Sequence, residues 1–195
     1  RLPLRAGMAV LEVGCGTGWV LVQLARREPN LRLFGLDASR SMLARAHRRL
    51  ARLRLPEPAR LVHGLAEQLD AAAMFARPEG FDLILFSYCL SMLAQPEEAL
   101  ARALYALAPG GTLAAVDFGA LNAWPALSAA MIRKWLALFG AAHRPQIGPF
   151  FRQAAEARGG DFEFHNLAGG YAELHVLRTG LNPAARTRSL AECQS

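Results

Sequence analysis

The chain has 195 residues, of which 53% are hydrophobic, and 22 basic against 16 acidic residues give it a formal charge of +6. This length and apolar content suffice for one sizeable core, so we expect a single domain over residues 1–180 and a flexible tail over 181–195. No apolar run reaches the roughly 18 residues of a membrane span, no signal-peptide pattern opens the sequence, and three widely spaced cysteines indicate neither a disulfide framework nor a metal site.

Residues 10–18 (VLEVGCGTG) form the first informative segment. An apolar run contains Glu12 and leads into glycines at every second position, after which helix-forming residues begin at Trp19. This pattern predicts a buried strand that turns sharply into a helix, with a bare backbone on which a ligand can rest. It resembles motif I of the class I S-adenosylmethionine (SAM) methyltransferases rather than the G-x-G-x-x-G of dinucleotide folds. The residues that this resemblance assigns to the methionine part of SAM are Glu12, Gly14, Cys15, Gly16 and Gly18.

The second strand is predicted over residues 31–36 and is closed by Asp37. A doubly wound fold that binds a nucleotide cofactor places an acid here to accept hydrogen bonds from the ribose hydroxyls, about 20 residues beyond the glycines. A simple helix cap is the alternative role for Asp37. Ser39 is a plausible cap for the helix that follows, and Ala38 and Met42 at its start join the predicted cofactor residues.

The helix after Asp37 carries a basic face opposite an apolar stripe. A solvated helix face is the simplest explanation, and attraction to an anionic membrane surface, worth about 1 kcal/mol per basic residue, is the alternative. Nucleic acid is not expected as a partner, because neither aromatic interleaving nor a binding motif accompanies the charge. The basic face consists of Arg45, Arg48, Arg49, Arg52 and Arg54.

Strands and helices continue to alternate along the chain, which predicts an α/β doubly wound fold. We expect a seven-stranded, mostly parallel sheet with an antiparallel last strand, as in the Rossmann-like fold of SAM methyltransferases. The remaining predicted elements are strands at 59–63, 81–86 and 112–117, helices at 96–107 and 127–139, a Pro-Gly-Gly turn at 109–111, and an antiparallel pair at 162–165 and 172–178.

Ligands of such sheets bind at the carboxyl ends of the strands. In related methyltransferases the third strand is often followed by Gly-Asp-Ala, whose acid reads the adenine amino group, whereas this chain has Gly64-Leu65-Ala66. We therefore expect backbone groups near Ala66 and apolar packing from Leu65 to hold the adenine. Ser87, at the end of the fourth strand, is a further predicted cofactor contact.

A narrower resemblance covers later parts of the chain, namely residues 86–93, 116–119, 124–125, 135–136 and 169–172. They resemble the N-methyltransferases of betaine-lipid synthesis, which methylate the amine of a diacylglyceryl homoserine lipid. This resemblance implies an amine acceptor of small-molecule or lipid-head-group size. It also implies an enzyme of the cytoplasm that meets its acceptor in solution or peripherally at the inner membrane.

Methyl transfer to an amine requires the protein to hold the nitrogen in line with the methyl group at about 3 to 3.5 Å and to let a proton leave. Tyr88 is predicted to orient the amine by its hydroxyl or to stabilise an ammonium by its ring, which is worth about 0.5 to 2 kcal/mol. Asp117 is predicted to attract a cationic head group or to accept a proton, and Tyr171 is a further aromatic candidate. An ordinary rim aromatic and a structural turn contact are the respective alternatives for Tyr88 and Asp117.

A second apolar stripe has helical spacing and lies beside Arg133 and Lys134. We expect this helix to pack on the sheet, and contact of its first part with acyl chains or the bilayer interface is the alternative, since tryptophan is favoured there. The stripe consists of Trp124, Leu127, Met131, Trp135 and Leu138.

Two other functions compete with amine methylation. The first is a C- or O-methyltransferase of another small molecule, such as a quinone-like acceptor. The second is a non-catalytic SAM-binding domain, which is considered because the helices that cover the cofactor in related enzymes do not precede the first strand of this sequence and because Leu65 stands where the adenine-reading acid is expected.

Overall fold

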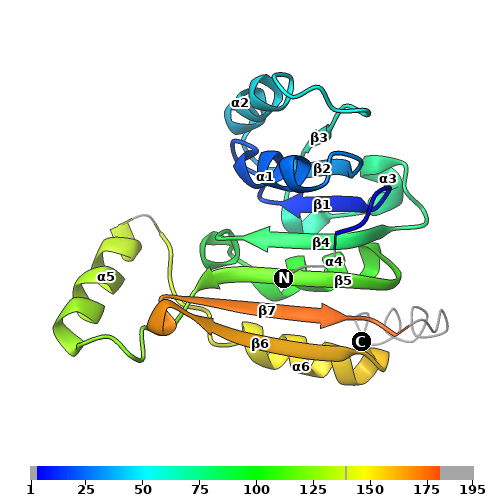
Figure 1. The fold of residues 1–195 in the computed structure, drawn as a ribbon. Helices are drawn as coiled ribbons and strands as arrows, with labels where there is room; N and C mark the ends of the chain where they lie inside the picture. Colours follow the sequence, from blue (N-terminus) through cyan, green and yellow to red (C-terminus); the bar gives the residue numbers. More distant parts are fainter. Residues whose placement is uncertain (1–3, 139, 181–195) are drawn as a thin grey trace.

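The computed structural model describes residues 4–138 and 140–180 and shows one sheet with helices on both faces (Figure 1). Its strands are β1 (Ala9–Val13), β2 (Arg32–Asp37), β3 (Arg60–His63), β4 (Phe81–Ser87), β5 (Leu107–Phe118), β6 (Asp161–Leu167) and β7 (Ala172–Arg178). They follow the order β3-β2-β1-β4-β5-β7-β6, and β7 runs antiparallel to both of its neighbours, β5 and β6. The predicted fold class is confirmed. The tail predicted at 181–195 and Phe139 lie outside the described residues.

The centre of the sheet is buried on both faces. Leu11 of β1 lies opposite Phe34 of β2 on one side and Ile84 of β4 on the other, and all of β1 is buried. A parallel strand covered by helices on both faces can bury every side chain, so β1 and β4 have apolar runs instead of alternating patterns. The carboxyl ends of these strands meet at one edge of the sheet.

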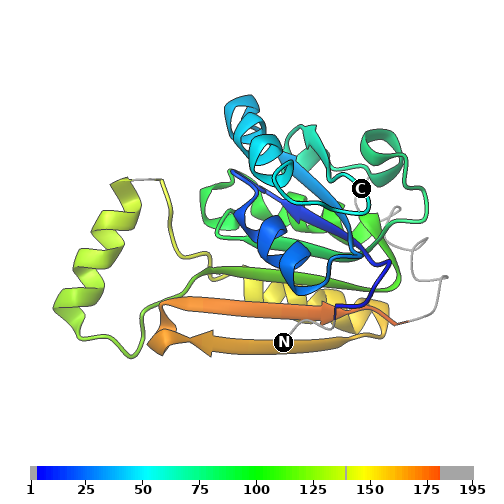
Figure 2. The same ribbon diagram turned by 45° about the horizontal axis from the view of Figure 1, so that its top comes forward.

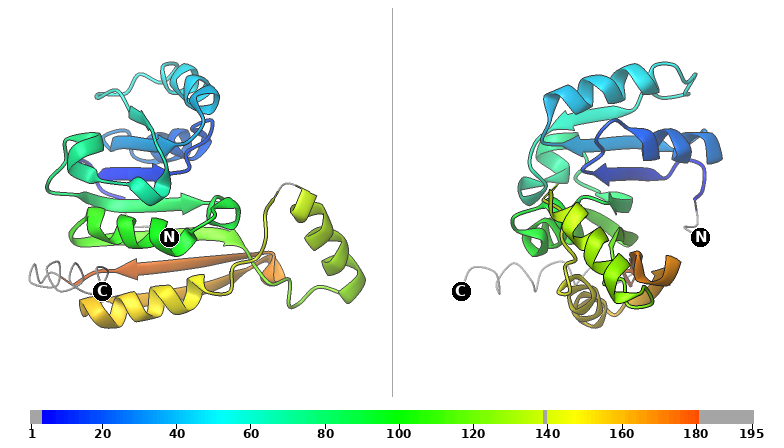
Figure 3. Two further views of the ribbon diagram at one scale, coloured as in Figure 1. Left: turned by 180° about the vertical axis from the view of Figure 1, so that it is seen from behind. Right: turned by 90° about the vertical axis from the view of Figure 1, so that its left-hand side faces the viewer.

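Two layers of helices cover the sheet. The helices are α1 (Trp19–Arg27), α2 (Arg40–Leu50), α3 (Ala71–Phe75), α4 (Pro96–Ala106), α5 (Ala126–Leu138) and α6 (Ile147–Arg158), with short 3-10 turns η1 (Ala66–Gln68), η2 (Leu90–Met92) and η3 (Ala168–Gly170). Residues of α1 and α2 form one apolar core with the sheet, and residues of α3, α4 and α6 form the other. Figure 3 shows α4 and α6 over this second face.

A helix cap and an aromatic cluster hold the elements near β3 in place. Ser39 accepts a hydrogen bond from the Met42 amide at 3.4 Å, which confirms the predicted cap of α2. The rings of Phe34, Phe75 and Phe81 contact one another edge to face at centroid distances of 5.2 to 5.8 Å. This cluster anchors the short helix α3 to the sheet.

The start of β5 differs from the prediction. We expected a turn at 109–111 before a strand at 112–117, but α4 ends at Ala106 and β5 begins at Leu107. Leu107 lies opposite Phe81 and Thr112 lies opposite Leu83, so the residues between them bulge out of the ladder. The Pro-Gly-Gly segment is therefore an irregularity inside β5 rather than a turn in front of it.

Helix α5 does not pack on the sheet, so that expectation was wrong. Figures 1 and 2 show it projecting from the edge at which the central parallel strands end. Leu127, Met131 and Leu138 are 77%, 66% and 78% exposed, whereas Ala129 and Leu136 on the opposite side are buried. Among the residues that the structure describes, no helix is long and apolar enough to cross a bilayer.

Candidate active site

The loop between β1 and α1 requires glycine at its alternate positions. Gly14, Gly16 and Gly18 have φ angles of +70°, +52° and +71°, a region that side chains disfavour. A Cβ on Gly14 would lie 2.7 Å from the Cβ of Cys89, and one on Gly18 would lie 3.0 Å from that of Ala46. A Cβ on Gly16 would meet no atom within 4 Å, so the backbone there borders open space. This is the part of the loop that a ligand can approach.

Glu12 lies under the loop as a buried acid. It is 2% exposed, and among the described residues its Oε2 atom has no hydrogen-bond partner. Burial raises its pKa from 4.5 to about 8, with a smaller upward contribution from Asp37, while a hydrogen bond from the Leu21 amide acts in the opposite direction. A carboxyl group held this way becomes more stable as an anion when a cation comes near.

Asp37 ties the glycine loop to the second helix. Its Oδ2 accepts a hydrogen bond from the Gly16 amide at 2.7 Å, and its Oδ1 accepts one from the Ser39 amide at 2.8 Å. Each carboxylate oxygen has a second lone pair, so Asp37 keeps acceptor capacity for a ligand hydroxyl. Ala38 and Met42 are exposed beside it.

The segment after β3 lies next to Asp37. The Gly64 amide donates to the Asp37 carbonyl at 3.1 Å, and a Cβ on Gly64 would lie 2.4 Å from the end of the Met74 side chain. Leu65 is 47% exposed and Ala66 begins η1. An exposed leucine beside an acid suits the flat face of a base near a ribose.

The two cysteines near the loop fill space. Cys15 and Cys89 are both buried, and burial raises the pKa of each thiol well above its usual range. The Cys89 thiol donates to the Val13 carbonyl at 3.2 Å. Neither thiol is activated as a nucleophile, because a nucleophile needs a lowered pKa.

Tyr88 follows β4 in a strained conformation. Its φ angle is +52°, which for a residue with a side chain costs about 1 to 3 kcal/mol. The Tyr88 amide donates to the Val116 carbonyl at 2.8 Å, and this bond helps to hold the residue at the end of β4, directly after Ser87. Partial burial, with Tyr171 and Asp117 nearby, raises its pKa.

Four aromatic side chains line up from Tyr88 toward α5, and we call them the aromatic row. Tyr88 lies 5.1 Å from Phe118, Phe118 lies 5.8 Å from Tyr171, and Tyr171 lies 6.5 Å from Trp124, as centroid distances. The Trp124 ring donates to the Ala168 carbonyl at 3.0 Å. The sequence singled out Tyr88 and Tyr171 as acceptor residues, whereas it placed Trp124 in the second apolar stripe and Phe118 only within the segment 116–119 of the narrower resemblance.

Asp117 lies behind the aromatic row and is 5% exposed. Its Oδ2 accepts a hydrogen bond from the Ser91 amide at 2.9 Å and its Oδ1 accepts one from the Phe118 amide at 2.8 Å. These bonds join η2 to the end of β5, which is the turn contact considered as its alternative role. Its catalytic role stays a prediction.

Two basic residues that were not among the predicted site residues lie in the chain after α5. His143 lies 3.2 Å from the Phe118 carbonyl through Nδ1, and Arg144 donates to the Ser91 and Leu93 carbonyls at 3.3 and 2.9 Å. The buried Nε of Arg144 has no hydrogen-bond partner within residues 4–138 and 140–180. The same part of the chain holds no group of three or more His, Cys, Asp or Glu side chains placed to bind a metal ion.

A comparison with known families decides the class of this site. The family profile described as "Methyltransferase domain" matches residues 10–111, from β1 through the bulge in β5. The chain belongs to this family. The glycine loop, Asp37 and the segment after β3 all lie inside the matched range, and the predicted class of SAM-dependent methyltransferase is confirmed.

The curated relatives of this methyltransferase domain differ in how much they share with it. Trans-aconitate 2-methyltransferase of Methylobacterium nodulans is 37% identical over 115 residues, which cover 58% of this chain and 40% of that protein. The uncharacterized methyltransferase YdaC of Bacillus subtilis is 28% identical over 185 residues, covering 94% of this chain and 88% of that protein. The chain thus spans about 40% of the length of the trans-aconitate relative, and neither name is that of a betaine-lipid enzyme.

Solved structures share the fold. The plantazolicin methyltransferase BpumL, in complex with a substrate analog and SAH, superposes with a TM-score of 0.69 at 15% identity, covering 90% of this chain and 77% of that one. An O-methyltransferase family protein from Burkholderia thailandensis has the same TM-score at 20% identity, covering 89% of this chain and 51% of that one.

The residues of this methyltransferase domain fit its cofactor SAM. The unpartnered Oε2 of Glu12 suits a cationic group of the methionine part, and the open space at Gly16 admits that part against the backbone. Asp37 has lone pairs left for ribose hydroxyls, and Leu65 offers an apolar surface for adenine. The individual cofactor contacts of these residues stay predictions.

Proposed function

We propose that this methyltransferase domain transfers the methyl group of SAM to the amine nitrogen of an acceptor that rests against the aromatic row. The acceptor is a small molecule or the head group of a betaine-type lipid, which the protein meets at a membrane surface. The aromatic row carries this proposal, because its ring faces are electron-rich and attract an ammonium group. Such faces favour the cationic product of amine methylation over an anionic acceptor.

The chemistry divides between cofactor and chain. SAM supplies a methyl group bound to a positively charged sulfur. The lone pair of the acceptor nitrogen forms the new N–C bond, and the sulfur keeps the electron pair of the S–C bond that breaks. The protein has to hold the nitrogen of the neutral amine in line with the methyl group of SAM and let the amine proton pass to water. Tyr88 is 39% exposed, so its hydroxyl can orient the nitrogen at the solvent boundary where that proton leaves.

The strain at Tyr88 supports its positioning role. A left-handed conformation in a tyrosine persists only where the surroundings fix it, and the bond to the Val116 carbonyl and the Phe118 ring contribute to this. Phe118 and Tyr171 then present further ring surface to the substituents of the amine. Asp117 is the proposed source of negative charge behind the row.

Methylation of a carboxylate is the second candidate, and Arg144 is the observation that favours it. A relative of this domain is named for trans-aconitate, a carboxylic acid. The unpartnered buried Nε of Arg144 is a donor for an acceptor carboxylate, with His143 beside it in the chain. A chain that uses this donor would make a methyl ester instead of a methylated amine.

The test is a product assay with labelled SAM. The acceptors are a diacylglyceryl homoserine lipid in mixed micelles, a water-soluble homoserine ether, trans-aconitate and a quinol, with products identified by mass spectrometry. We expect methylated amine, and we expect Phe118→Leu to lower kcat/KM for the amine about tenfold while leaving SAM affinity unchanged. Phe164→Leu is the matched control, because Phe164 is exposed on β6 and outside the aromatic row.

Each other outcome selects a competing function. Methyl ester as the sole product would overturn the amine proposal in favour of carboxylate methylation. Loss of the ester product in the Arg144→Gln variant would then identify Arg144 as the hydrogen-bond donor to the acceptor carboxylate. Methylation of the quinol alone would assign a C- or O-methyltransferase of a different acceptor. SAM binding without turnover of any acceptor would assign a non-catalytic SAM-binding domain.

A further inference from the structure

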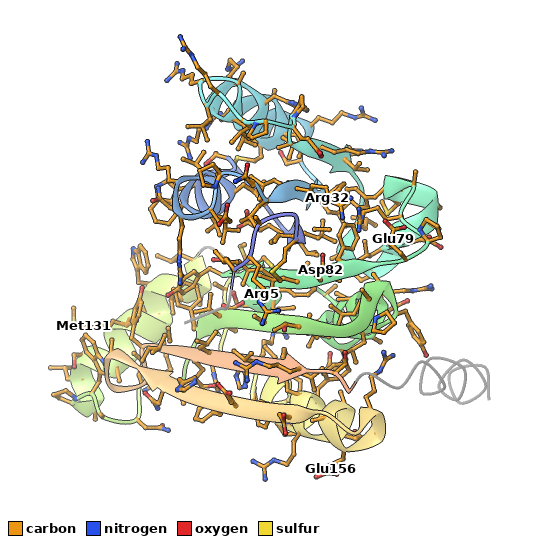
Figure 4. All side chains as sticks on the ribbon, turned by 45° about the vertical axis from the view of Figure 1, so that its right-hand side comes forward. Arg5, Arg32, Glu79, Asp82, Met131 and Glu156 are labelled. Carbon is orange, nitrogen blue, oxygen red and sulfur yellow. The ribbon has the colours of Figure 1, made fainter. Side chains whose placement is uncertain are left out.

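Helix α5 turns its large apolar side chains outward. Leu127, Met131, Trp135 and Leu138 lie three or four residues apart and so form one face of the helix, and Trp124 lies two residues before its start; together we call them the α5 stripe. The stripe consists of Trp124, Leu127, Met131, Trp135 and Leu138, which are 38%, 77%, 66%, 55% and 78% exposed. Figure 4 shows Met131 at the margin of the molecule, on the helix that projects from the sheet.

The side of α5 opposite the stripe carries the two buried residues of the helix. Ala129 and Leu136 are buried on it, while the residues of the stripe are exposed. This is the reverse of a surface helix in a globular domain, which turns its large apolar residues inward. A contiguous apolar patch of this kind on a water-soluble domain marks an interaction surface.

The charge around the stripe identifies its partner. From residue 118 to residue 155 the sequence contains no Asp or Glu, whereas it contains Arg133, Lys134, Arg144 and Arg152. Both Arg133 and Lys134 are exposed on α5 itself. Exposed apolar residues that include two tryptophans, flanked by basic residues without acidic ones, complement the interface of an anionic bilayer. A second protein surface of neutral or basic character would gain nothing from these charges.

We propose that α5 docks this domain on anionic lipid bilayers, with the α5 stripe in the interface and Lys134, which borders the stripe, at the level of the lipid phosphates. The helix lies in the plane of the surface and does not span it. Trp124 belongs both to the stripe and to the aromatic row, so the docked surface is continuous with the acceptor side of the active site. Bilayer binding by itself is independent of the acceptor, and only the use of a lipid acceptor there rests on the proposed function.

The experiment measures vesicle binding by flotation. Vesicles of phosphatidylglycerol and phosphatidylcholine in equal parts are compared with pure phosphatidylcholine vesicles, without SAM or any acceptor. We expect binding to the anionic vesicles, reduced at least tenfold in the double variant Leu127→Ser with Met131→Ser. We expect Lys134→Gln to weaken binding about fivefold, and Arg133→Gln, on the side of the helix opposite the stripe, to weaken it less.

The matched control is the double variant Ala130→Ser with Ala137→Ser, which adds two serines to α5 on a side away from the stripe and should bind as the parent does. Every variant has to keep the parent circular dichroism spectrum and SAM affinity, since the altered residues are exposed. Equal affinity for both vesicle types, or no vesicle binding at all, would overturn the proposal. A dimer in light scattering that separates in the Leu127→Ser variant would instead assign the stripe to a second copy of the chain.

Failure here and failure of the proposed function are separable. Turnover of the water-soluble amine does not require a bilayer, so it can succeed when flotation fails. Vesicle binding does not require methyl transfer, so it can succeed when no acceptor is turned over.

Discussion

At the scale of single residues, the predicted cofactor contacts depend on a backbone without side chains at Gly16 and on a buried acid, Glu12, with one oxygen atom that has no hydrogen-bond partner among the described residues. Gly16 borders open space at φ +52°, and Glu12 is buried beneath the loop with an unpartnered oxygen. Both were identified from the sequence, because a strand followed by alternating glycines is a local pattern. The contacts of Phe118 and Trp124 with Tyr171 were not predicted, because these residues join Tyr171 only after β5 pairs with β7, some 50 residues further along the chain.

The open space at Gly16 can be tested with one methyl group. Gly16→Ala should weaken SAM binding at least tenfold and lower the free energy of unfolding by about 1 to 2 kcal/mol, the cost of a side chain in the left-handed region. Gly159→Ala is the matched control, because Gly159 has φ +57° and likewise no atom within 4 Å of its Cβ position. Calorimetry measures the affinity and urea unfolding the stability. Equal SAM affinities of the two variants would mean that SAM does not contact the loop at Gly16.

At the scale of elements, helical periodicity told us which residues of α5 share a face but not where that face points. The same spacing describes a helix that packs inward and one that turns its large residues outward, because periodicity contains no information about the neighbouring surface. The buried strands were predictable for the opposite reason, since a short apolar run such as residues 83–86 of β4 is typical of the middle of a sheet covered on both faces.

The aromatic cluster that anchors α3 gives a stability prediction for that element. Phe75 is 1% exposed and contacts both Phe34 and Phe81. Phe75→Ala should lower the free energy of unfolding by about 3 to 5 kcal/mol, because it removes a buried ring and leaves a cavity. Phe164→Ala, at a ring that is 48% exposed, should cost clearly less in the same urea titration. Similar losses in the two variants would mean that α3 is not held by this cluster.

At the scale of the whole molecule, Glu12 makes stability depend on pH. In the folded protein the Glu12 carboxyl group keeps its proton up to about pH 8, whereas in the unfolded chain it releases the proton near pH 4.5. The folded state therefore binds more protons between these values, so stability is highest below this window and falls as pH rises through it, by at most about 1.4 kcal/mol per pH unit. Above about pH 8 the full loss is present.

The measurement compares thermal unfolding of the parent and of Glu12→Gln from pH 5 to pH 9. The parent should lose stability relative to the variant over this range, and parallel curves would contradict the raised pKa. Burial lowers the pKa of His175, which makes stability rise with pH near 6.5 in both proteins. The difference between the two curves cancels that contribution and isolates Glu12.

The position of β7 limits the order in which the strands of the sheet can pair during synthesis. β6 lies at the edge of the sheet and pairs with β7, which in turn fills the place beside β5. During synthesis, α6 and β6 therefore leave the ribosome before the strand that attaches β6 to the sheet exists. Until residues 172–178 arrive, the edge of β5 stays open and Tyr171 has no fixed place beside Phe118. The synthesis of β7 thus completes both the pairing of this sheet and the aromatic row.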